Sequence, residues 1–64
     1  MNGGPSLHII AIVAPSADLV QPGSAPLFVH DDPEMRKAMA LTLAKMAQAA
    51  VHQVPGDIYV IVRH

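Results

Sequence analysis

Histidine and carboxylate side chains are the groups of this 64-residue chain that could do chemistry. The four histidines are spread along the chain, at His8, His30, His52 and His64. The densest polar group is His30-Asp31-Asp32, and imidazole and carboxylate groups are common ligands of divalent metals. Adjacent residues at a helix start rarely surround an ion, so the pattern favours helix capping. We therefore predict no metal site and no cofactor.

Motifs of the common nucleophilic and phosphate-handling enzymes are absent from the sequence. There is no cysteine, no glycine-rich phosphate loop and no His-Glu-x-x-His pattern. The helix start is a poor phosphate site, because Asp31, Asp32 and Glu34 repel the anion that a helix dipole attracts. The net charge of −1, with one tyrosine, one phenylalanine and no tryptophan, argues against a nucleic-acid partner.

Three strands are predicted to position these residues. The β-branched run at 7–14 has strand length and is apolar on both faces apart from His8. Alternation along it would place Ile9 with Ala11 and Val13 on one face. A short strand is predicted at 27–29, and 57–63 is the clearest strand of the chain.

A long loop and one helix are predicted to join these strands. The segment 15–26 contains three prolines and a Gln-Pro-Gly-Ser turn, so it is predicted to be the loop. Asp32-Pro33 is a strong helix start, and the helix is predicted to run to about Gln53, before Pro55-Gly56. At 100° per residue, one apolar stripe is predicted to pack in the core. Its members are Met35, Met39, Leu43, Met46, Ala50 and Val54.

The predicted fold is α+β, a β-α-β unit with one helix over one face of a parallel sheet. Strands 7–14 and 57–63 would be parallel, because a helix joins them. The sheet face opposite the helix carries Ile, Val and Ala, with nothing else in the chain to cover it. Since a chain of this size is marginal as a monomer, we expect a homo-oligomer joined through its sheet faces.

The chain is expected to form a single domain over 1–64, beginning with a loose terminus at 1–6. No basic leader is present, and the longest apolar run, 9–14, is far shorter than the roughly 20 residues of a membrane span. We therefore expect a cytoplasmic protein with no membrane partner.

Two motifs in the second half of the chain point to a known family. They are Asp-Pro-Glu-Met-Arg-Lys at 32–37 and Val-Pro-Gly-Asp-Ile-Tyr-Val-Ile-Val at 54–62. This half of the chain, 32–64, resembles the small 4-oxalocrotonate tautomerases. The resemblance implies a β-α-β subunit that assembles into an oligomer.

The resemblance also implies an activity. Those enzymes use an amino-terminal proline as general base and arginines to hold substrate carboxylates. It therefore implies a tautomerase or isomerase acting on a small keto/enol acid, with Pro5 as catalytic base once the residues before it are removed. His8, Tyr59 and Arg63 would bind the small carboxylate ligand, because alternate residues of two strands share a face.

Several departures from that family favour a second hypothesis. Gly4 acylates Pro5, and an amide nitrogen is not a base. The positions aligned with the family's arginines hold Asp31 and Tyr59, and 15–29 is an insertion. The alternative is a non-catalytic, tautomerase-like oligomer that serves as a binding or assembly subunit. A generic α+β interaction module is the third hypothesis, and whether the chain is an enzyme stays open.

Overall fold

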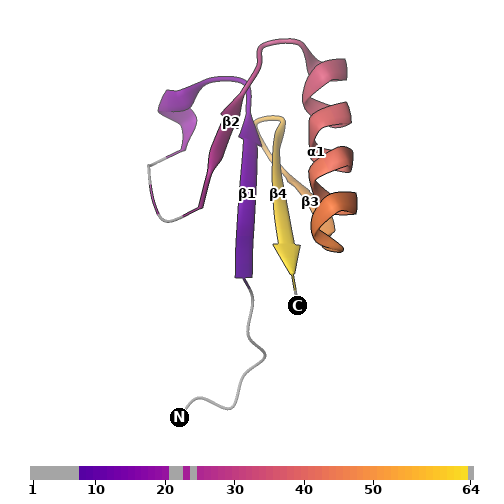
Figure 1. The fold of residues 1–64 in the computed structure, drawn as a ribbon. Helices are drawn as coiled ribbons and strands as arrows, with labels where there is room; N and C mark the ends of the chain where they lie inside the picture. The colour runs from indigo at the N-terminus through magenta and orange to yellow at the C-terminus, as the bar shows by residue number, and fades with distance from the viewer. Residues whose placement is uncertain (1–7, 21–22, 24, 64) are drawn as a thin grey trace.

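The computed structural model describes residues 8–20, 23 and 25–63, and it is an α+β fold (Figure 1). The elements in chain order are β1 (His8–Ala14), the 3₁₀ helix η1 (Ala17–Leu19), β2 (Leu27–Val29), α1 (Pro33–Ala47), β3 (Ala50–Val54) and β4 (Ile58–Arg63). The predicted α+β class is confirmed. The three predicted strands are also confirmed, with boundaries within one residue over the described part of the chain.

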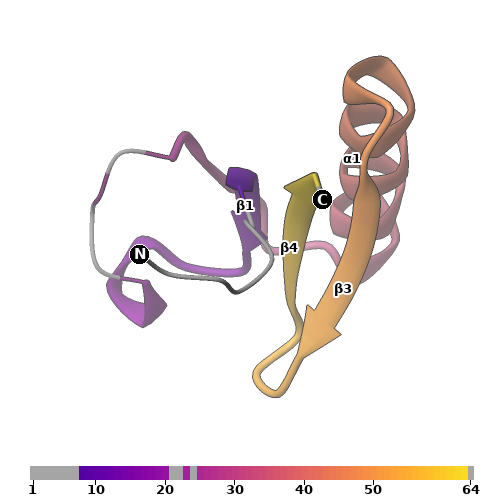
Figure 2. The same ribbon diagram turned by 90° about the horizontal axis from the view of Figure 1, so that it is seen from below.

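The four strands form one mixed sheet in the order β2-β1-β4-β3. β1 and β2 are parallel, whereas β4 is antiparallel to both of its neighbours, β1 and β3. β1, β2 and β3 therefore run in the same direction, and α1 carries the chain from one edge strand to the other (Figures 1 and 2). The predicted parallel pairing of the first and last strands is wrong, because the chain forms β3 and turns back before β4.

The helix ends at Ala47 rather than near Gln53. Gln48 takes the left-handed conformation, at φ 54° and ψ 50°, and its N–H donates to the carbonyl oxygens of Ala44 and Lys45. Ala50 to Val54, predicted as the last helical turn, pair instead with β4 along the whole of β3. The Pro55-Gly56 signal is therefore the turn of a β-hairpin and not the stop of a helix.

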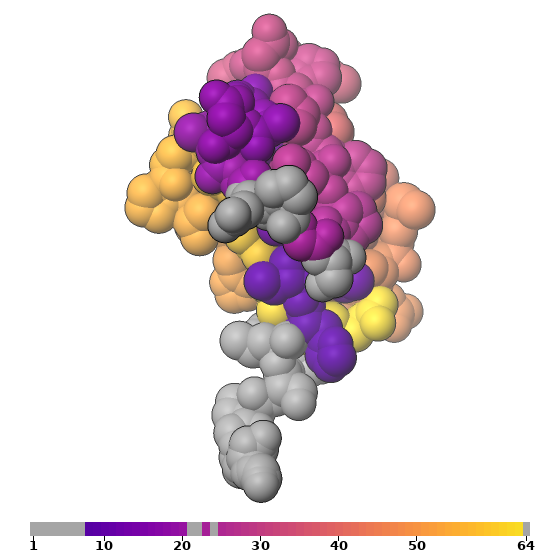
Figure 3. Space-filling model, turned by 90° about the vertical axis from the view of Figure 1, so that its left-hand side faces the viewer, coloured from indigo at the N-terminus to yellow at the C-terminus, as the bar shows by residue number. Residues whose placement is uncertain are grey.

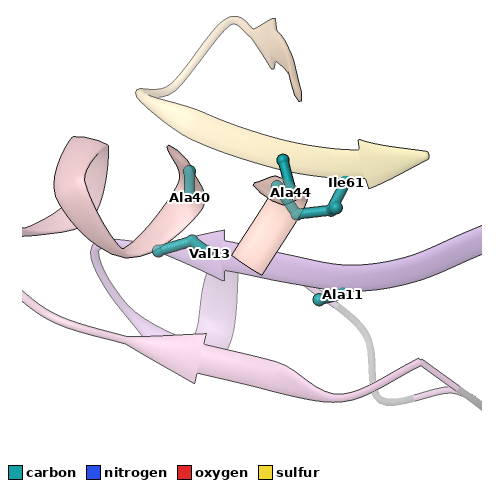
Figure 4. Packing of buried hydrophobic residues seen from close by; sticks show 5 residues of the cluster. All are labelled: Ala11, Val13, Ala40, Ala44 and Ile61. Atoms are coloured by element: carbon teal, nitrogen blue, oxygen red, sulfur yellow. The ribbon is translucent and has the colours of Figure 1, made fainter. Parts of the chain in front are cut away.

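A small core lies between α1 and the two central strands (Figure 4). It consists of Ala11, Val13, Ala40, Ala44 and Ile61. The stripe of α1 that is buried is Arg36, Ala40 and Ala44. Alanine side chains are short, so this stripe lets the helix approach the sheet closely.

The methionine-rich stripe predicted to form the core is only partly buried. Met39 and Leu43 are half-buried and pack against the core, whereas Met35 and Met46 are exposed. The reason is that α1 turns its alanines toward the sheet, which leaves these methionines at the flanks of the contact.

A β-bulge in β1 changes which side chains share a face. Ile9 pairs with Val62 and Ala11 pairs with Ile61, so Ile10 is an extra residue between them. Strict alternation along β1, as predicted from the sequence, is therefore wrong. Ile9 lies on the face opposite Ala11, away from the helix.

The β3–β4 turn depends on a glycine that can adopt a positive φ. Gly56 has φ 97°, a conformation that a side chain disfavours, whereas Gly23 has open space around it. Gly56→Ala is expected to lower the free energy of unfolding by about 1–2 kcal/mol, measured by chemical denaturation. The matched Gly23→Ala variant is expected to change it by less than about 0.5 kcal/mol. Equal effects of the two substitutions would contradict this assignment of strain.

Candidate interaction surface

One face of the sheet points away from α1 (Figure 2), and the residues that the strand pairing places on it are almost all apolar. We call it the helix-free face, and the strand pairing defines its members, because directly paired residues point to the same side. They are Ile9, Ile12, Ala14, Leu27, Val29, Ala50, His52, Val54, Ile58, Val60 and Val62. His52 is the single polar residue in this set.

Large apolar side chains on the helix-free face remain in contact with solvent. Ile9 is 52% exposed, Val29 is 47% exposed and Val54 is 38% exposed. Single exposed apolar residues are normal, but a connected apolar face without charges is typical of an interaction site. An apolar face opposite α1, as predicted from the sequence, is thus present in the described part of the chain. It is only partly open, because Ala14 and Val62 within it are buried, at 0% and 7% exposure.

Two shallow apolar hollows flank Leu43 on the other side of the molecule. The first, of about 260 Å³, is lined by Ile10, Ala11, Leu43, Met46, Ala47 and Ile61. The second, of about 360 Å³, is lined by Phe28, Met35, Ala38, Met39, Thr42 and Leu43. A catalytic pocket needs several convergent polar groups, and the lining of these two hollows offers one threonine hydroxyl.

Among the described residues, Arg36 is the one charged residue that is buried, at 3% exposure. Its Nη1 donates to the carbonyl oxygen of His30 at 3.0 Å, and its Nη2 lies 4.0 Å from Oδ2 of Asp57. Arg36 therefore connects the segment before α1, the helix itself and the β3–β4 turn. Its Nε is buried without a hydrogen-bond partner.

Sequence reasoning missed Arg36 as a structural residue. Arginine is usually exposed, and nothing in the spacing around Arg36 marks its side chain as buried. The start of α1 is otherwise as predicted, because the Asp32 side chain accepts from the Glu34 N–H and Pro33 occupies the first turn. His30 Nδ1 accepts from the Asp32 N–H at 3.0 Å, which is consistent with a capping role for this cluster.

The structure brings two of the predicted ligand-binding residues together and leaves the third apart. His8 and Arg63 are paired neighbours on β1 and β4, whereas Tyr59 pairs with Val13 near the other end of the sheet. The Arg63 Nη2 donates to the carbonyl oxygen of Ala47 at 3.0 Å, where it caps the end of α1. Substrate binding by these three residues stays a prediction. Pro5, the predicted base, lies outside the described residues.

Residues 8–20, 23 and 25–63 contain neither a metal-ligand cluster nor a membrane-spanning helix. No group of three or more His, Cys, Asp or Glu side chains is placed to hold a metal ion there. No helix in this part of the chain has the length and apolar character needed to cross a membrane.

The pKa of Asp18 is lowered by the hydrogen bond that its carboxylate accepts from the Ser16 hydroxyl. Ser16 also caps η1, because its Oγ accepts from the Asp18 N–H. Ser16→Ala is expected to raise the pKa of Asp18 toward its ordinary value, as measured by NMR titration. Because the folded state lowers this pKa, the contribution of Asp18 to stability is present at neutral pH and lost as the pH falls through that pKa. An unchanged pKa in Ser16→Ala would remove the hydrogen bond as the cause.

Comparison with known protein families matches residues 6–64 to the family described as "Capping complex subunit for YIEGIA". The chain belongs to this family. No curated protein and no solved structure matches it. The YIEGIA capping subunit family thus covers both halves of the sequence, including the 15–26 loop.

Membership of the YIEGIA capping subunit family overturns the resemblance to 4-oxalocrotonate tautomerases. The resemblance rested on a helix start and a strand signal that many α+β proteins share. The predicted tautomerase activity on a keto/enol acid is therefore also wrong. The alternative hypothesis of a non-catalytic assembly subunit fits the family description.

Proposed function

We propose that this chain is a non-catalytic subunit of the capping complex for YIEGIA, and that it binds a protein partner in that complex through the helix-free face. The observation that carries the proposal is the family match over residues 6–64. The exposed side chains of Ile9, Val29 and Val54 supply the apolar contact that such a subunit needs.

Covering the helix-free face gains apolar contact at a small cost in desolvation. Burial of apolar surface is favourable, at about 25 cal/mol per Å². Burial of charges is costly unless they are paired, and the helix-free face carries no Asp, Glu, Lys or Arg. A partner that covers this face therefore gains apolar contact without removing a carboxylate, ammonium or guanidinium group from water.

The arrangement of the titratable residues supports a non-catalytic role. Acid–base catalysis needs side chains that converge on one reacting group. Arg63 is held by the carbonyl oxygen of Ala47, and Tyr59 lies near the opposite end of the sheet from His8 and Arg63. The two hollows beside Leu43 are apolar and receive none of these groups.

Co-expression of the full chain with YIEGIA tests the proposed function. A tag on the chain is expected to retain YIEGIA through affinity purification and size-exclusion chromatography, as a complex of defined stoichiometry. A tagged protein of similar size and charge from outside the family serves as the control. Quantitative separation of the chain from YIEGIA at micromolar concentrations would contradict the proposal.

A further inference from the structure

The two edges of the sheet differ in how they are protected against pairing with another strand. Exposed edges template new strands unless they are short, charged, bulged or interrupted by proline. β2 has three residues and follows Pro26 directly. β3 has five residues, no charge, no proline and a regular register with β4, and no described strand lies beyond it.

The β3 edge is also sterically accessible in the structure. β3 is an edge strand of the sheet, and the turn end of the β3–β4 hairpin, in gold, lies at the margin of the molecule (Figure 3). Figure 2 shows α1 above one face of the sheet, which leaves the outer side of β3 uncovered by the helix. A further strand can therefore be added next to β3 without moving α1.

Charge is segregated along the direction of the strands. All five carboxylates lie at one end, which we call the acidic end: Asp18, Asp31, Asp32, Glu34 and Asp57. They occupy η1, the start of α1 and the β3–β4 turn, where β1, β2 and β3 all finish (Figure 1). Lys45 and Arg63 lie at the opposite, basic end, where α1 and β4 finish.

The two remaining cationic residues, Arg36 and Lys37, alter this separation of charge little. Arg36, near the acidic end, is buried and faces Asp57, and Lys37 follows it in α1. β3 therefore runs from the basic end of the molecule to its acidic end. Two copies that pair antiparallel through β3 place the basic end of each beside the acidic end of the other, whereas parallel pairing would set like charges together.

We propose that two copies of this chain pair antiparallel through β3, around a twofold axis at His52, to form a continuous eight-stranded sheet. This register pairs Ala50 with Val54 of the second copy and uses every residue of β3. A shift in either direction leaves part of the strand unpaired. Side chains keep their faces across the junction, so the two helix-free faces join into one apolar surface.

A charge-swap experiment at the symmetry axis tests this register. His52→Lys or His52→Glu places two like charges directly opposite each other, and the dimer Kd is expected to rise about fivefold or more. An equimolar mixture of the two variants is expected to recover dimer, because Lys and Glu then face one another. His52→Gln serves as the neutral control, and circular dichroism checks that every variant is folded.

The readout is the solution mass, by light scattering across a concentration series of the full chain, whose monomer mass is 6.8 kDa. Wild-type dimer is also expected to weaken as salt is raised, since the complementary ends are exposed charges. A wild-type monomer at every concentration overturns the proposal. So does a dimer that survives both charged variants, or a failure of the mixture to recover dimer. A wild-type monomer whose β3 amides become protected when YIEGIA is added would assign the edge to that partner instead.

Discussion

Replacing Arg36 by alanine is expected to lower the free energy of unfolding by about 2–4 kcal/mol. The side chain is 4% exposed, so its removal leaves a cavity under α1. The carbonyl oxygen of His30 loses its 3.0 Å donor at the same time. The segment before α1, α1 itself and the β3–β4 turn lose their common contact. Urea denaturation measures the change in the free energy of unfolding.

A volume-conserving variant separates the charge of Arg36 from its packing. Arg36→Met keeps most of the apolar stem and removes a buried Nε that has no partner. Its cost is expected to be about 1 kcal/mol or less, since apolar isosteres often replace buried charges without loss. Asp57→Asn is expected to have a small effect, because the carboxylate is largely exposed and 4.0 Å from the guanidinium. Equal losses in Arg36→Ala and Arg36→Met would show that charge, and not packing, stabilises this contact.

Replacing Ile9 by aspartate is expected to weaken binding to YIEGIA about tenfold or more. Ile9 belongs to a central strand and projects from the helix-free face at 52% exposure. A carboxylate there would have to be desolvated without a partner when the face is covered. Isothermal titration or surface binding of the purified proteins measures the change in Kd.

Leu41 supplies a matched control for this substitution. It is 53% exposed, nearly the same as Ile9, but it lies on the outer side of α1. Leu41→Asp is expected to leave the Kd within about twofold, whereas Val29→Asp is expected to weaken binding as Ile9→Asp does. Weakening by Leu41→Asp with retention by Ile9→Asp would move the docking surface to the helix and contradict the proposed function.

The start of α1 could be predicted from the sequence, whereas its end could not. Asp32 and Pro33 act locally, through a side-chain cap and a fixed φ, so the sequence alone reveals them. The stretch from Ala50 to Val54 fits both a last helical turn and an edge strand. Pairing with β4 decides between them, and that contact is tertiary.

For the topology and the candidate site, too, local patterns could be predicted from the sequence and tertiary contacts could not. An apolar face opposite the helix could be predicted, because Ile and Val on both sides of two strands exceed what one helix can cover. That Ala14 and Val62 within this face are buried could not be predicted. The exact membership of the face could not, because the bulge at Ile10 moves Ile9 to the helix-free face. The role of Arg36 depends on the carbonyl of His30 and the distant Asp57, which no local pattern indicates.

Methyl NMR of the chain bound to YIEGIA tests the docking of the helix-free face most directly. The methyl groups of Ile9, Val29 and Val54 are expected to shift or broaden on binding and to lose contact with solvent. The methyl groups of Leu41 and Met46, on α1, are expected to keep the shifts of the free protein. Perturbation confined to α1, with Ile9 and Val29 unchanged in the complex, would contradict the account.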